Sequence, residues 1–66
     1  MTPGEALRAA RERRGLSIEE LAHASHVSAL TIARAEKDVA PLTREDSRKL
    51  ANGLGMKLHA LMRGAA

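Results

Sequence analysis

Residues 17–37 read SIEELAHASHVSALTIARAEK, and this stretch contains two helix start signals in close succession. Serine is a favoured N-cap residue, and Glu20 stands at the third position after Ser17, which completes a capping box. Ser28 supplies the second cap. The pattern predicts one short helix that ends near Ser25 and another that runs to the end of the stretch. Two short helices joined by a turn of about three residues form a helix-turn-helix motif.

Similar start signals on both sides of this motif predict three more helices. Thr2-Pro3-Gly4-Glu5 combines an N-cap, a first-turn proline and a capping-box acid, and a helix follows to about Arg14. Thr43-Arg44-Glu45-Asp46 begins a fourth helix in a similar way, and leucines at helical spacing predict a fifth over about 58–62. Nothing in the sequence indicates a strand. The expected fold is therefore all-α: a compact five-helix domain that occupies residues 1–66 as a single unit.

The composition narrows the possible partners and the way in which the domain is stabilised. A chain of 66 residues has a small core, and such domains usually need disulfides, a metal or a second subunit. Cysteine is absent, so we expect a homodimer, with a two-fold interface near the C-terminus that includes Met62. Phenylalanine, tryptophan and tyrosine are also absent, which argues against nucleic-acid binding by base stacking. Lys and Arg number 11 against 8 acids, and the net charge of +3 suits a polyanionic partner.

Membrane, targeting and catalytic signals are not found in the sequence. No apolar run approaches the roughly 20 residues of a membrane span, and the basic residues between Arg8 and Arg14 interrupt any signal-peptide pattern. We therefore expect a soluble cytoplasmic protein that associates with the nucleoid. His23 and His26 stand about one helical turn apart, but no third ligand accompanies them, so we expect no metal site. The residues predict no enzyme, no cofactor and no small-molecule ligand.

A set of residues with characteristic spacing runs through most of the chain. Its members are Leu7, Arg11, Gly15-Leu16-Ser17, Leu21-Ala22, Val27-Ser28, Ile32, Glu36, Leu50-Ala51, Leu54-Gly55 and Leu58 to Met62. In this set the sequence resembles the Cro- and phage-repressor-type helix-turn-helix domains, which share the lambda-repressor-like fold. The resemblance implies double-stranded DNA as the partner, with the second helix of the motif, the recognition helix, in the major groove.

The resemblance also implies which residues meet DNA. Base-facing positions fall on Ala29, Leu30 and Arg34, and the Arg34 guanidinium matches the O6 and N7 acceptors of guanine. Ala29 and Leu30 can offer only apolar contacts to thymine methyl groups. Positions implied near phosphates are Ser17, Ser28, Thr31, Lys37 and Arg44, with Arg13 and Arg14 added if the end of the first helix approaches DNA.

A structural ion pair between Arg11 and Glu36 is implied as well. It would join the first helix to the third, and both charges would be partly buried. Arg11 is therefore not counted among the DNA contacts.

The sequence departs from the family pattern at several positions. Ile18 stands where a glutamine often opens the second helix, and His26 stands at a turn position that usually holds glycine and its positive φ. Arg44 and Ser47 replace apolar residues, and the recognition helix is poor in polar groups. Two functions therefore remain open: a sequence-specific DNA-binding repressor that acts by operator occupancy, and a protein-interaction module, antitoxin-like for example, with weak or no DNA specificity.

Overall fold

Side-chain hydroxyls cap the first four helices at the positions that the sequence indicates. The computed structural model describes residues 2–62, and in it each cap accepts a hydrogen bond from the backbone N–H at the third helical position. The caps are Thr2, Ser17, Ser28 and Thr43. In the first two helices a glutamate at that third position also accepts from the N–H of the cap, so both predicted capping boxes are confirmed.

Five helices follow from these caps, and the all-α prediction is confirmed for residues 2–62. They are α1 (Pro3–Arg13), α2 (Ile18–Ser25), α3 (Ala29–Glu36), α4 (Arg44–Gly53) and α5 (Leu58–Met62). The two helices of the predicted motif, α2 and α3, are joined by residues 26–28, which agrees with the short turn expected from the sequence.

Residues in the left-handed region end the first four helices. Gly15 ends α1 and Gly55 ends α4, both with a φ of 68°, in turns where the following N–H reaches back to a carbonyl of the last helical turn. α3 ends in the same way, but the left-handed residue is Asp38, with a φ of 57°. His26 ends α2 with a φ of 61°, the positive value associated with the glycine that usually stands at this turn position in the pattern that the sequence resembles.

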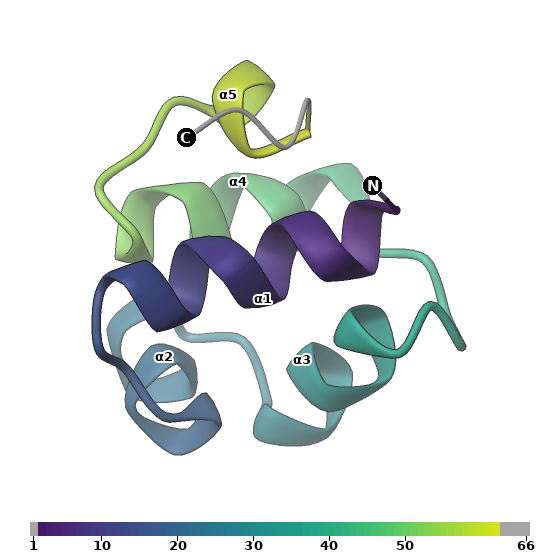
Figure 1. Ribbon diagram of the computed structural model, residues 1–66, viewed down its shortest axis with the longest axis horizontal. Helices are drawn as coiled ribbons and strands as arrows, with labels where there is room; N and C mark the ends of the chain where they lie inside the picture. Colours follow the sequence, from purple (N-terminus) through teal and green to yellow (C-terminus); the bar gives the residue numbers. More distant parts are fainter. Residues whose placement is uncertain (1, 63–66) are drawn as a thin grey trace.

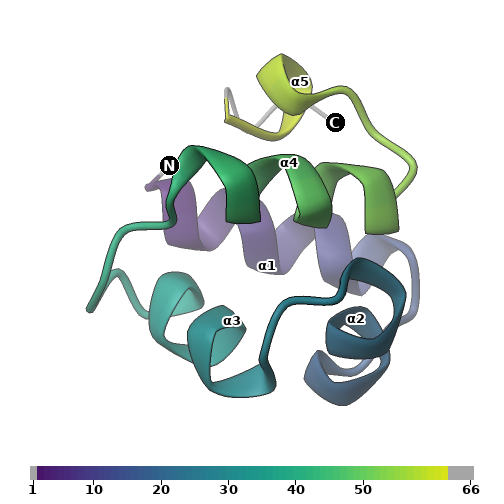
Figure 2. The same ribbon diagram turned by 180° about the vertical axis from the view of Figure 1, so that it is seen from behind.

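The helices lie in three tiers (Figures 1 and 2). α1 and α4 cross the middle of the molecule, α2 and α3 lie on one side of them, and α5 lies on the other. α1 packs against α3 and α5, α4 packs against α2 and α5, and α2 contacts α3. The helix-turn-helix motif therefore packs against α1 and α4, and α5 packs against the opposite side of these two helices.

Aliphatic side chains from every tier form the core. Leu61 of α5 is buried with the side chains of the other helices, and Ile18 and Ala22 are half-buried against them. The largest fully buried side chains are Leu7, Leu21, Ile32, Leu50 and Leu54. The core therefore contacts the inner surfaces of both α2 and α3, which fixes the position of the motif on the domain.

Two glycines allow the motif to approach the middle tier closely. A β-carbon at Gly4 would lie 2.5 Å from the carbonyl oxygen of Ala35 and 2.6 Å from that of Glu36. A β-carbon at Gly53 would lie 2.9 Å from Cβ of Ser25. The start of α1 thus rests directly on the last turn of α3, and the end of α4 rests on the last turn of α2.

Two expectations from the sequence concern a second subunit and a membrane. The two-fold interface expected around Met62 lies outside the described residues, which include neither that side chain nor residues 63–66. Within residues 2–62, every helix is too short or too polar to span a bilayer.

Candidate nucleic-acid interface

α3 has an inner face in the core and an outer face in solvent. Ile32 and Ala35 are buried on the inner face. On the other side, Leu30, Arg34 and Lys37 recur at helical spacing and are exposed, Leu30 by 58%. Thr31 is half-buried. We define the outer face of α3 as Ala29, Leu30, Ala33, Arg34 and Lys37, of which the two alanines are half-buried.

The two hydroxyl groups at the start of α3 bond to each other. Ser28 Oγ donates to Thr31 Oγ1 over 2.7 Å and accepts from the Thr31 backbone N–H over 3.1 Å. The Ser28 hydroxyl proton is therefore used within the cap, while the Thr31 hydroxyl proton is still free for an acceptor outside the helix. Of these two residues, Thr31 is the one equipped to donate to a phosphate.

Buried groups hold the turn between α2 and α3. Ser25 is 2% exposed, and its Oγ donates to the Leu21 carbonyl over 2.6 Å and accepts from the Val27 N–H over 3.3 Å. Val27 is buried as well, while His26 is exposed. Sequence reasoning assigned no role to Ser25, because a serine near a helix end commonly bonds back to its own helix. Here the Ser25 hydroxyl oxygen takes part in two hydrogen bonds, one to the last turn of α2 and one to the N–H of Val27 in the turn. These two bonds fix the direction in which the chain leaves α2 toward α3.

Arg11 and Glu36 join α1 to the end of α3 through a two-pronged ion pair. Arg11 Nε lies 2.7 Å from Glu36 Oε2, and Nη2 donates to Oε1 over 3.0 Å. Nη1 donates to the Leu16 carbonyl over 2.8 Å, beyond the end of α1. The two side chains are only 12% and 7% exposed. The hydrogen bond to Glu36 raises the pKa of Arg11 above its ordinary value, so the guanidinium stays charged.

Asp38 makes a second connection between the same two helices. Its carboxylate accepts from Thr2 Oγ1 over 2.6 Å and from the Gly4 N–H over 2.9 Å. A negative charge at the N-terminus of a helix interacts favourably with the helix dipole and the free N–H groups there. The residue that ends the recognition helix therefore also caps α1, a contact that the sequence analysis did not predict.

The first turn of α2 is negatively charged. Glu20 Oε1 accepts from the Ser17 N–H over 2.7 Å, and Ser17 Oγ accepts from the Glu20 N–H over 3.0 Å. The backbone hydrogen bond from Ser17 lowers the pKa of Glu20, so this carboxylate is ionised at neutral pH. Glu19 is exposed beside it. Ser17, implied near a phosphate, thus lies next to two carboxylates in the structure.

The other basic residues considered for phosphate contact lie around the motif. Arg44 is exposed at the start of α4, and Arg13 and Arg14 are exposed at the end of α1. Arg14 Nη2 lies 3.5 Å from the Gly55 carbonyl, so it interacts with the end of α4. Within residues 2–62, Arg34, Lys37 and Arg44 form no ion pair, which leaves their charges available to a partner.

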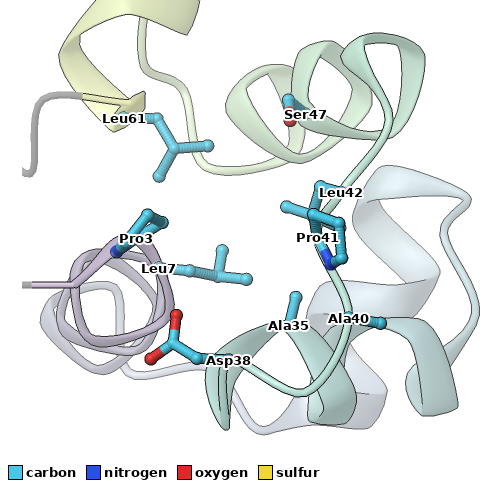
Figure 3. A pocket seen from close by; sticks show the side chains of 9 residues that line it. All are labelled: Pro3, Leu7, Ala35, Asp38, Ala40, Pro41, Leu42, Ser47 and Leu61. Carbon is cyan, nitrogen blue, oxygen red and sulfur yellow. The ribbon is translucent and has the colours of Figure 1, made fainter.

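A cavity of about 270 Å³ lies behind the end of α3, on the core side of the helix (Figure 3). Ser47, which stands where the family favours an apolar side chain, is 3% exposed and lines it. The full lining is Pro3, Leu7, Ala35, Asp38, Ala40, Pro41, Leu42, Ser47 and Leu61. The cavity is therefore separate from the outer face of α3, because none of that face's residues lines it.

The described part of the chain brings no three metal-binding side chains together. His23 is exposed on α2 and His26 is exposed in the turn. Of the residues that the sequence suggests for a functional site, the structure brings together those of α3 and of the turn before it.

A family model described as helix-turn-helix matches residues 7–61. The matched segment begins within α1 and ends within α5, so it includes the motif and the helices that support it. No curated protein and no solved structure matches the chain.

Proposed function

The chain belongs to the Cro- and phage-repressor-type helix-turn-helix family, and from this membership we propose that it represses transcription by occupying a specific sequence of double-stranded DNA. Membership makes it a DNA-binding regulator of the helix-turn-helix kind. The observation that carries the finer proposal is the outer face of α3, where Arg34 and Lys37 are exposed on a helix whose other side is held in the core. An α-helix of this kind fits the major groove, where each base pair presents a distinct edge.

In this proposal each exposed cation has a separate task. Arg34 donates two hydrogen bonds to O6 and N7 of a guanine, while Lys37 and Arg44 approach phosphates. Thr31 donates its hydroxyl proton to a phosphate oxygen. Two copies of the single domain form a symmetric dimer that reads two half-sites about one helical turn apart. Occupancy of that site blocks polymerase, in the cytoplasm.

A protein-interaction module is the second candidate function. Leu30 exposes 58% of its surface, and the first part of the outer face offers only apolar groups. Such a surface suits a partner protein as well as a groove.

The dependence of binding on salt separates the two functions. Each phosphate that is neutralised adds about −0.9 to the slope of log affinity against log salt. Lys37 and Arg44 from two protomers would give a slope near −4, so affinity for a duplex should fall about a hundredfold between about 50 and 200 mM salt. Fluorescence anisotropy with a labelled duplex measures this slope. Absence of binding to any duplex at low salt would contradict DNA binding and favour the protein-interaction module.

Replacement of Arg34 by alanine should weaken binding to the best duplex by about 1–3 kcal/mol and leave affinity for unrelated duplexes nearly unchanged. The reason is that only the matched duplex presents guanine acceptors to the guanidinium. Arg8→Ala is the matched control, since Arg8 is exposed on α1 and paired with Glu12 within its own helix. If specific and non-specific affinities fall together in Arg34→Ala, the residue contacts only phosphate.

Replacement of Glu19 by glutamine should strengthen DNA binding, because it removes a negative charge from the end of α2 that faces the phosphate backbone in family docking. The expected gain is about 0.2–1 kcal/mol, the range for one exposed charge interaction, and it should shrink at high salt. The capping box stays intact because Glu20 is unchanged. Glu12→Gln makes the same change of charge on α1 and should have a smaller effect. Unchanged affinity in Glu19→Gln would show that the start of α2 stays away from the backbone.

A further inference from the structure

The part of the outer face nearest to the start of α3 is apolar. Leu30 is exposed, and Ala29 and Ala33, one helical turn apart, are half-buried beside it. Among the described residues the other exposed large hydrophobic side chain is Val39, which lies beyond α3 in the connection to α4. Leu30 thus stands out as an apolar group within a face whose far end carries Arg34 and Lys37.

The polar groups near Leu30 are poorly suited to reading bases. The Ser28 hydroxyl accepts from the Thr31 N–H and donates to the Thr31 hydroxyl, so it is already satisfied. Thr31 is half-buried and has a single proton left to donate. In this docking geometry the N-terminal residues of the recognition helix contact base edges. Because the function proposed above assigns the Thr31 proton to a phosphate, recognition of bases at this end of α3 depends on apolar contact.

We propose that Leu30 reads the C5-methyl group of a pyrimidine, and that 5-methylcytosine is accepted there in place of thymine. The proposal rests on the DNA-binding function above and names the chemical group that the apolar end of α3 recognises. The methyl group is the apolar feature of the major-groove edge. A leucine side chain neither donates nor accepts a hydrogen bond, so it does not distinguish the O4 acceptor of thymine from the N4 donor of cytosine. Thymine and 5-methylcytosine carry the same methyl group on the same ring atom.

The spacing on α3 relates this methyl group to the guanine read by Arg34. Leu30 and Arg34 are separated by one turn, which is about 6 Å along a helix axis. Successive bases of one strand are about 3.4 Å apart. The methyl-bearing pyrimidine should therefore lie within about two base pairs of the guanine, and methylation of a cytosine at that position would change the affinity of the site.

The test begins with selection of duplexes from a random pool by the full chain at moderate salt. Each thymine of the selected duplex is then replaced singly by deoxyuridine, which lacks only the C5-methyl group, and dissociation constants are measured by anisotropy. At one position close to the selected guanine, deoxyuridine should weaken binding about fourfold, the factor expected for one buried methyl group. With a C·G pair at that position binding should be equally weak, and 5-methylcytosine should restore it to within about twofold of thymine.

Two variants assign the effect to Leu30. Leu30→Ala should bind the thymine and deoxyuridine duplexes equally, and its melting curve should match that of the wild type because the side chain is exposed. Val39→Ala removes the other exposed large side chain and should keep the fourfold preference for thymine. A wild-type chain that selects a sequence yet binds thymine and deoxyuridine equally at every position would overturn the proposal. So would a preference for thymine that survives in Leu30→Ala. Failure to bind any duplex would instead contradict the DNA-binding function on which the proposal rests.

Discussion

Replacement of Arg11 by alanine is expected to lower the free energy of unfolding by about 3–5 kcal/mol, the usual cost of removing one partner of a buried ion pair. Arg11 donates two hydrogen bonds to Glu36 and a third to the Leu16 carbonyl. Its removal leaves a carboxylate that is 7% exposed without its counter-charge. A domain of this size has roughly 0.05–0.15 kcal/mol of stability per residue, so the variant should be largely unfolded when warmed. Thermal and urea unfolding followed by circular dichroism measure the loss.

Two comparisons separate the buried pair from a general effect of lost charge. Arg8→Ala breaks the exposed pair between Arg8 and Glu12, whose side chains are 64% and 55% exposed, and should cost less than about 1 kcal/mol. A double variant, Arg11→Met with Glu36→Leu, removes both charges together and should recover much of the stability lost in Arg11→Ala. If Arg11→Ala melts like Arg8→Ala, the ion pair does not hold α1 to α3.

Replacement of Gly4 by alanine should lower the free energy of unfolding by about 3 kcal/mol, at the upper end of the range for overpacking. In an ordinary helix this substitution stabilises, because alanine has the higher helix propensity. Here the added β-carbon would lie 2.5 and 2.6 Å from two backbone carbonyl oxygens of α3 and 2.8 Å from Asp38 Oδ1. Backbone atoms cannot move away as the end of a side chain can, so α1 must separate from α3 and the Asp38 cap must open.

Gly53→Ala provides the comparison for this variant. Its β-carbon would meet Ser25 Cβ at 2.9 Å, and no carbonyl oxygen is among its nearest neighbours. We therefore expect a smaller loss than in Gly4→Ala, measured by the same unfolding curves. A Gly4→Ala chain that is as stable as the wild type would show that α1 and α3 do not lie as closely as described.

Helix boundaries could be predicted from the sequence because each depends on a few adjacent residues. The caps at Thr2, Ser17, Ser28 and Thr43 are serine or threonine ahead of an apolar-periodic run, and all four cap helices in the structure. The end of the first helix near Arg14 was also predicted, and Gly15 follows it in the left-handed region, as is common after a helix. The orientation of Ile32 and Leu7 toward the core follows from helical periodicity.

Contacts between distant residues could not be obtained in this way. Asp38 reaches Thr2 across 36 positions, and nothing adjacent to either residue marks the pairing. The end of the third helix near Lys37 was predicted, but the left-handed turn at Asp38 was not, because an aspartate is less common there than glycine. The close approach of Gly4 to α3 likewise depends on how α1 and α3 pack against each other, which the residues adjacent to Gly4 do not indicate.

The candidate interface likewise has some features that the sequence predicts and others that it does not. The exposure of Leu30 and Arg34 follows from the period of α3. The acidic first turn of α2 was overlooked, although the capping box that contains Glu20 was itself the signal. Once Ser17 and Glu20 cap each other, the start of α2 already has an anion of its own. The capping box at the start of α2, which was identified as a helix start signal, therefore also affects how closely DNA can approach this helix.

The division of α3 into two faces has a consequence for how chains of this kind diverge. Ile32, Ala35 and Glu36 hold the helix in place, while the side chains of Ala29, Leu30, Ala33, Arg34 and Lys37 form no hydrogen bond within residues 2–62. The three of these that are exposed, Leu30, Arg34 and Lys37, can be exchanged with little loss of stability, since substitutions at exposed sites usually change it by less than about 0.5 kcal/mol. A library randomised at these positions alone should yield mostly folded members with new target sequences, so the scaffold can be retargeted without being rebuilt.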